Sequence, residues 1–102
     1  MGDNMFVHIV FFKWKKSAPK EEIVKIISDL REMRDKIPGI IGLRSGHNYS
    51  MDLHDYTHAL VVSFKDKKSL DDYRKNPMHM KVVKKIILYE EHSLAIDFED
   101  HT

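Results

Sequence analysis

The feature that most constrains the fold of this chain is a nine-residue segment near its start, Phe6–Trp14, with the sequence FVHIVFFKW. Its aromatic and β-branched residues favour an extended strand, and the segment is too short for a typical helix. Successive residues of a strand point to opposite faces of a sheet, and apolar residues occupy both alternating sets here. The sequence therefore predicts a strand that has apolar residues on both faces.

The next two segments predict a helix and an irregular strand. Apolar residues recur at helical spacing between Pro19 and Pro38, and prolines at these places are typical of a helix start and of the chain beyond a helix end. The segment 40–49 alternates only weakly and, with Gly39, carries three of the four glycines of the chain. Glycines inside a strand indicate a β-bulge or a bend.

The second half of the chain repeats this order. Residues 56–64 alternate between two faces and predict a third strand. Asp66 is the predicted N-cap of a short helix, and Pro77 interrupts the helical pattern before a further helix at about 78–88. Residues 93–98 predict the last strand.

This order, β-α-β-β-α-β with the second helix in two parts, predicts an α+β fold of the ferredoxin-like (split βαβ) type. Such a fold has a four-stranded antiparallel sheet with its helices on one face. We expect a single domain over residues 1–102, with an ordered core at about 5–99, because a chain of 102 residues is too short for two domains.

The other face of the predicted sheet has no helices to cover it. Monomeric proteins rarely expose a contiguous apolar patch, yet the residues expected on this face are apolar. The sequence therefore predicts a homodimer in which two such faces pack together. The residues of this predicted dimer face are Val7, Ile9, Phe11, Ala59 and Val61.

Composition excludes several classes of function. Seventeen basic and sixteen acidic residues give a net charge of +1, which does not favour a nucleic-acid partner, and Ala59 and Val61 occupy positions where an RNA-binding sheet needs aromatic rings. The absence of cysteine excludes disulfides and thiolate chemistry. There is no apolar run of about 20 residues and no signal-peptide pattern, so we expect a cytoplasmic protein without a membrane partner.

Among the seven histidines, two are predicted on adjacent strands, on faces that are otherwise aromatic and aliphatic. These residues, His8 and His58, either form a polar pair at the floor of a pocket or are core histidines whose hydrogen bonds are satisfied. A third, His79, shares a helix face with Val82 and Ile86.

Tyr73 precedes His79 on the other side of Pro77, where the chain can turn and bring the two side chains together. In an apolar pocket, a phenol that orients an imidazole makes a usable general base. The alternative is that both residues close the rim of the pocket without a chemical role.

A cluster of possible metal ligands at 47–55 is better explained as a solvated loop. Its members, His47, Asp52, His54 and Asp55, do not have the spacing of ligands on a helix or strand, and no second cluster would complete a coordination sphere. We therefore predict no metal and no cofactor.

Five short motifs occur in order along nearly the whole chain: HIVFFK at 8–13, IPG at 37–39, YTH at 56–58, Tyr73 followed by NPMH at 76–79, and IDF at 96–98. As a set they resemble the stress-responsive dimeric A/B barrel (Dabb) family. The resemblance implies a ferredoxin-like protomer that dimerises into a barrel. The chain departs from many relatives at Asn76, where they have histidine.

The resemblance also implies roles for particular residues. In a plant polyketide cyclase of the family, a tyrosine and a histidine that match Tyr73 and His79 act together in an aldol cyclisation. The pocket of that enzyme also holds the histidines that match His8 and His58.

We therefore expect a cofactor-free protein that binds, cyclises or isomerises a small carbonyl compound. His79 is the expected proton acceptor, and Tyr73 is expected to orient it and to donate a hydrogen bond. The expected substrate-binding residues are His8, His58, Val10, Phe12, Leu60 and Ile86. The alternative is a non-catalytic stress-response or interaction protein whose stable oligomer is the functional unit.

Overall fold

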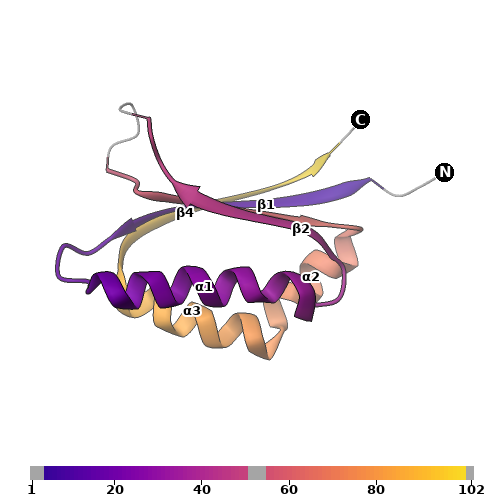
Figure 1. The fold of residues 1–102 in the computed structure, drawn as a ribbon. Coiled ribbons are helices and arrows are strands. Elements are labelled where there is room, and N and C mark those ends of the chain that lie inside the picture. Colours follow the sequence, from indigo (N-terminus) through magenta and orange to yellow (C-terminus); the bar gives the residue numbers. More distant parts are fainter. Residues whose placement is uncertain (1–3, 51–54, 101–102) are drawn as a thin grey trace.

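The computed structural model describes residues 4–50 and 55–100 and confirms the predicted ferredoxin-like fold (Figure 1). One antiparallel sheet has the strand order β2-β3-β1-β4, and the helices lie on one of its faces. The elements are β1 (Met5–Trp14), α1 (Lys20–Lys36), β2 (Ile40–His47), β3 (His58–Phe64), α2 (Lys67–Lys75), α3 (Pro77–Tyr89) and β4 (Glu90–Asp100).

β1 lies in the interior of the sheet because β3 pairs with one of its edges and β4 with the other. Val10, Phe12 and Trp14 point toward the helices and belong to the hydrophobic core. The residues that alternate with them point to the face without helices. The predicted strand with apolar residues on both faces is therefore a central strand of the sheet.

α1 covers the sheet through residues at helical spacing. Ile26, Leu30 and Met33 are at most 1% exposed, and burial of such a side chain stabilises the fold by about 1.5–3 kcal/mol. Acidic Glu21 in the first turn and basic Lys36 in the last turn complement the helix dipole. Packing of one apolar face therefore holds this helix to the sheet.

The turn after α1 depends on Gly39, which has a φ of +89°. A Cβ atom at this position would lie 2.2 Å from Oγ of Ser69, far inside van der Waals contact. The Ser69 side chain cannot move freely, because its hydroxyl and its backbone N–H both donate to the carboxylate of Asp66. Only glycine fits this turn, which connects α1 to β2.

The end of α2 and the start of α3 are set by Asn76 and Pro77. The side chain of Asn76 accepts a hydrogen bond from the N–H of Met78 at 2.9 Å, so Asn76 is the N-cap of α3. Proline follows at the first helical position, where its missing N–H costs nothing. Asparagine is a preferred N-cap residue, which accounts for its place at this helix start.

The limits of β2, β3 and β4 differ from the sequence predictions. β4 extends over Glu90–Asp100 rather than 93–98, because it pairs with β1 from Met5 to Trp14. β2 ends at His47 and β3 begins at His58, two residues inside the predicted limits in each case. The predicted irregularity of β2 is confirmed, since its register with β3 shifts between residues 40 and 42.

The face of the sheet without helices is apolar, as predicted, but its exposed area comes largely from β4. Leu94, Ile96 and Phe98 are 49%, 60% and 42% exposed. Val7 lies on this face but is only 6% exposed, because it occupies a central strand between neighbours on both sides. We call this surface the open face; its residues are Val7, Ile9, Phe11, Ala59, Val61, Leu94, Ile96 and Phe98.

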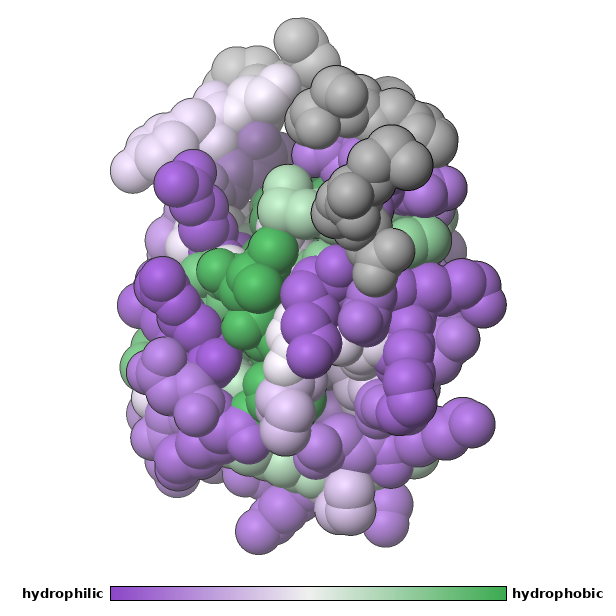
Figure 2. Space-filling model, turned by 90° about the vertical axis from the view of Figure 1, so that its right-hand side faces the viewer, coloured by the Kyte–Doolittle hydropathy of each residue, from purple (hydrophilic) through white to green (hydrophobic). Residues whose placement is uncertain are grey.

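The surface has a different character at the end of the molecule where both chain ends lie. Figure 2 shows this end, on which hydrophilic side chains surround a narrow strip of hydrophobic residues. None of the described helices is both long enough and apolar enough to span a membrane.

Candidate functional site

A cavity of about 200 Å³ lies between the sheet and the helices. It opens between α3 and β4, because Ile87 and Ala95 line it and are exposed. Every predicted pocket residue except His58 lines this cavity. The lining residues are His8, Val10, Phe12, Leu30, Leu60, Tyr73, His79, Val83, Ile86, Ile87, Glu90, Ser93 and Ala95.

Tyr73 is in the last turn of α2 and His79 is in the first turn of α3, and their side chains are in contact. Their ring centroids are 4.0 Å apart, with 34° between the ring planes. Tyr73 is 1% exposed, and its ring also contacts the ring of Phe64 at 5.0 Å. The two side chains are close, as expected. However, ring packing holds them together, because no hydrogen bond joins the Tyr73 hydroxyl to the imidazole in the described part of the chain.

One nitrogen of His79 is a buried polar atom with no partner. Nδ1 is enclosed by protein and has no hydrogen-bond partner among the described residues. Burial lowers the pKa of His79, the nearby backbone carbonyl of Arg74 opposes this effect, and the side chains of His8 and Arg74 lower the pKa further. His79 is therefore neutral near pH 7, which is the form that accepts a proton.

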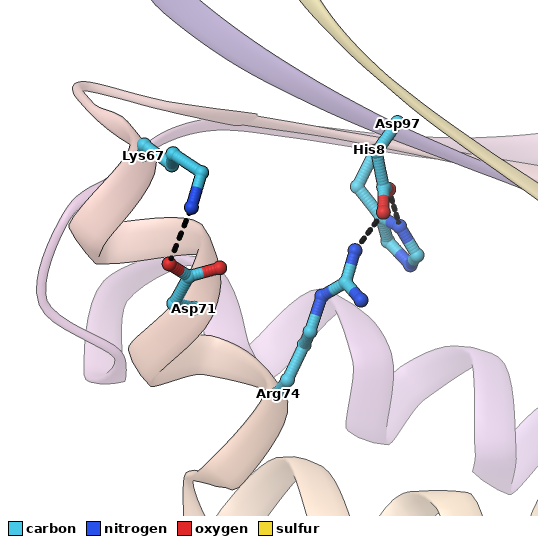
Figure 3. A network of polar contacts seen from close by, with 5 residues as sticks. All are labelled: His8, Lys67, Asp71, Arg74 and Asp97. Carbon is cyan, nitrogen blue, oxygen red and sulfur yellow. Dashed lines mark hydrogen bonds and ion pairs between the residues drawn. The ribbon is translucent and has the colours of Figure 1, made fainter.

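His8 belongs to a polar network that the sequence analysis did not include (Figure 3). Its Nδ1 lies 2.5 Å from Oδ1 of Asp97, and Arg74 reaches from α2 to pair with the other carboxylate oxygen. Because the carboxylate accepts, Nδ1 of His8 carries the proton and Nε2 keeps a lone pair. Asp97 thus sets the tautomer of His8.

The protonation states in this region follow from burial. Burial lowers the pKa of His8 to about 4, and the positive charge of Arg74 acts in the same direction. Burial raises the pKa of Tyr73, so its phenol stays protonated and can donate a hydrogen bond.

His58 does not line the cavity, and the expected pairing with His8 is wrong. The antiparallel register sets His58 opposite Phe12, four residues along β1 from His8, which is a separation of about 13 Å. His58 is instead a core histidine whose Nδ1 accepts a hydrogen bond from Nε1 of Trp14 at 3.0 Å. Burial lowers its pKa, and the neighbouring His47 acts in the same direction.

The residues at 47–55 that could ligate a metal are only partly described by the structure. His47 packs against His58, with ring centroids 4.2 Å apart, whereas Asp52 and His54 lie outside the described residues. In the part of the chain that the structure describes, no group of three or more histidine, aspartate or glutamate side chains is arranged to hold a metal ion.

Sequence reasoning missed three charged residues of this region, namely Arg74, Glu90 and Asp97. The period of two in β4 could have placed Asp97, because it alternates with Ile96 and Phe98 and so points to the helix side. No local pattern shows that Arg74 reaches across to β4, because that contact depends on how α2 packs on the sheet.

The fold and cavity define a class of protein, namely a ferredoxin-like α+β protein with a cavity beneath its helices and an uncovered apolar sheet face. Residues 6–100 match the family described as Stress responsive A/B Barrel Domain (Dabb), so the chain belongs to that family, as the motifs indicate. A stress-response A/B barrel domain-containing protein of Arabidopsis thaliana is 24% identical in an alignment that covers 88% of this chain and 87% of the relative.

Several solved structures share the fold. The hydroxynitrile lyase of Passiflora edulis has a TM-score of 0.89 and 17% identity, over 97% of this chain and 95% of the lyase. A dimeric ferredoxin-like protein of unknown function from Thermobifida fusca has a TM-score of 0.85 and 18% identity, over 96% of this chain and 92% of that protein. A similar dimeric protein from Jannaschia has a TM-score of 0.84 and 22% identity, over 94% and 99% of the two chains. At such identities the likeness establishes the fold alone.

Proposed function

We propose that this Dabb protein is a cofactor-free acid–base protein, similar to the polyketide cyclase of the family, that binds and then cyclises or isomerises a small carbonyl compound. The observation that carries the proposal is the convergence of His8, Tyr73 and His79 at one cavity that is otherwise mostly apolar. The name of the Passiflora edulis neighbour supports it, because that protein of the same fold is a lyase.

The proposed substrate carries a C–H bond next to its carbonyl group. The imidazole of His79 accepts this proton while the electrons of the C–H bond form an enolate, whose oxygen accepts a hydrogen bond from the Tyr73 hydroxyl. Return of the proton from His79 to another atom completes an isomerisation. Attack of the enolate carbon on a second carbonyl of the same molecule, with the proton passing to the new alkoxide, completes a cyclisation.

The proposal is tested by hydrogen–deuterium exchange at the carbons next to the ketone of 4-phenylbutan-2-one, followed by proton NMR in D2O. We expect the wild-type protein to accelerate exchange over buffer, and His79→Gln to slow it by at least about tenfold, since general base catalysis contributes about 10²–10⁴-fold. The matched control is His92→Gln, because His92 does not line the cavity. Equal exchange rates for wild type and His79→Gln would overturn the proposal.

We also propose that the protein is a homodimer that packs its open face against a second copy. The exposed side chains of Leu94, Ile96 and Phe98 support this arrangement, because an apolar patch of this kind is rarely left in water. The neighbours from Thermobifida fusca and Jannaschia, which are described as dimeric, support it as well.

The open face also favours a second candidate function, in which the protein is a non-catalytic stress-response protein and its oligomer is the functional unit. The two candidates are separated by cells that carry either His79→Gln or the open-face substitution Ile96→Lys. If only Ile96→Lys abolishes stress tolerance, the second candidate is supported. Loss of tolerance with His79→Gln, in a protein that remains folded and dimeric, supports the acid–base function.

A further inference from the structure

The cavity has a second polar end that the proposed reaction does not use. Glu90 and Ser93 line the same cavity as His8. Ser93 lies opposite Phe12, four residues along β1 from His8, so the two ends are about 13 Å apart. α3 extends between the same two ends of the cavity. His79 is in its first turn, and Glu90 follows its last residue.

The wall between the two ends is apolar. It is formed by Val10, Leu60, Val83, Ile86 and Ala95. A cavity of about 200 Å³ that extends over this length is narrow, and its volume is smaller than that of the pockets that hold drug-sized ligands. The cavity therefore fits an elongated molecule with an apolar middle and one polar group at each end.

The Glu90 end of the cavity carries negative charge. The backbone N–H of Glu90 donates to the carbonyl of Ile86, which holds the residue at the C-cap of α3, where the helix dipole adds partial negative charge. Lys15 donates to the carbonyl of Leu88 at 3.2 Å, yet no cation forms an ion pair with the Glu90 carboxylate in residues 4–50 and 55–100. The adjacent Glu91 differs, because its carboxylate lies 3.0 Å from Nζ of Lys13.

We propose that Glu90 and Ser93 select the tail of the substrate and favour a neutral or cationic hydrogen-bond donor there, such as a phenol, an alcohol or an amine. This inference rests on the proposed function, which places the carbonyl group at the His8–His79 end. The Glu90 carboxylate accepts a hydrogen bond from such a donor and repels a carboxylate tail, which would bring two like charges into a partly enclosed site.

The test compares 4-(4-hydroxyphenyl)butan-2-one with its analogue that bears a carboxylate in place of the hydroxyl group. Dissociation constants are measured by ligand-observed NMR or calorimetry. We expect the wild-type protein to bind the phenol about tenfold more tightly than the carboxylate. Glu90→Gln should remove most of this preference, and Glu90→Lys should reverse it. Glu91→Gln is the matched control and should keep the wild-type preference.

The outcomes separate this inference from the proposed function. If the ketones bind but the preference is the same in wild type, Glu90→Gln and Glu90→Lys, the inference is overturned while the acid–base function stands. If the preference follows Glu90 but His79→Gln leaves hydrogen–deuterium exchange unchanged, the inference stands and the catalytic role fails. If wild type binds neither ketone, both are overturned.

Discussion

The Nδ1 atom of His8 lies 2.5 Å from Oδ1 of Asp97, and this contact joins the helix-facing sides of β1 and β4. The other carboxylate oxygen is held by Arg74 from α2, so three elements meet at one side chain. Asp97 is therefore a positioning residue, because it sets which nitrogen of His8 carries the proton and leaves Nε2 with its lone pair.

We predict that Asp97→Ala destabilises the protein by about 1–3 kcal/mol, because the substitution leaves the partly buried Nδ1–H of His8 without its acceptor. The free energy of unfolding is measured by urea denaturation. Asp71→Ala is the matched control, since Asp71 forms a surface ion pair with Lys67, which Figure 3 shows beside the network. Such a pair contributes about 0–1 kcal/mol, so equal effects of the two substitutions would contradict the prediction.

Stability should fall as the pH decreases below about 6.5. Burial lowers the pKa of His8, His58 and His79, so the folded protein binds fewer protons than the unfolded chain in this range. For His8, the stabilisation is fully present above pH 6.5 and is lost as the pH falls toward about 4, with a contribution of at most about 3 kcal/mol.

Urea denaturation at pH 7.5 and pH 5 measures this dependence. Replacement of His8 by Gln should reduce the difference between the two pH values, because glutamine does not titrate. An unchanged difference in His8→Gln would show that this histidine does not carry the effect.

Gly39→Ala should destabilise the protein by about 2 kcal/mol or more. The new Cβ atom would meet the side chain of Ser69, and alanine does not readily adopt a φ of +89°. Gly46→Ala is the control, because a Cβ atom there has nothing within 4 Å. The comparison uses the midpoint of thermal or urea unfolding, and a Gly39→Ala protein as stable as Gly46→Ala would refute the explanation of this turn.

Ile96→Lys should weaken the proposed dimer by at least about tenfold, because Ile96 is 60% exposed at the open face and a lysine there would lose apolar contact area in both copies. Light scattering over a range of micromolar concentrations gives the oligomeric state. Val24→Lys is the matched control, since Val24 is 67% exposed but lies on α1. A wild-type protein that is monomeric throughout would rule out the dimer.

Much of the fold could be predicted because its signals are local. The alternation of apolar residues in 58–64 and the helical spacing of Ile26, Leu30 and Met33 report directly which face of each element is buried. Caps and prolines mark the ends of helices in the same way, as Asp66 and Pro77 do. The limits of β4 were predicted less well, since its length depends on its pairing with β1.

The amino-acid sequence was sufficient to predict the order of the elements and the strand with apolar residues on both faces. It was also sufficient to predict that Tyr73 lies close to His79 and to which family the chain belongs. Tertiary structure alone decided that His58 lies outside the cavity and that Arg74 and Asp97 join His8. The register of β1 and β3 separates His58 from His8, and the packing of α2 brings Arg74 to Asp97. Such contacts join residues from separate elements, so they depend on strand register and helix docking, which the periodicity of a single element does not encode.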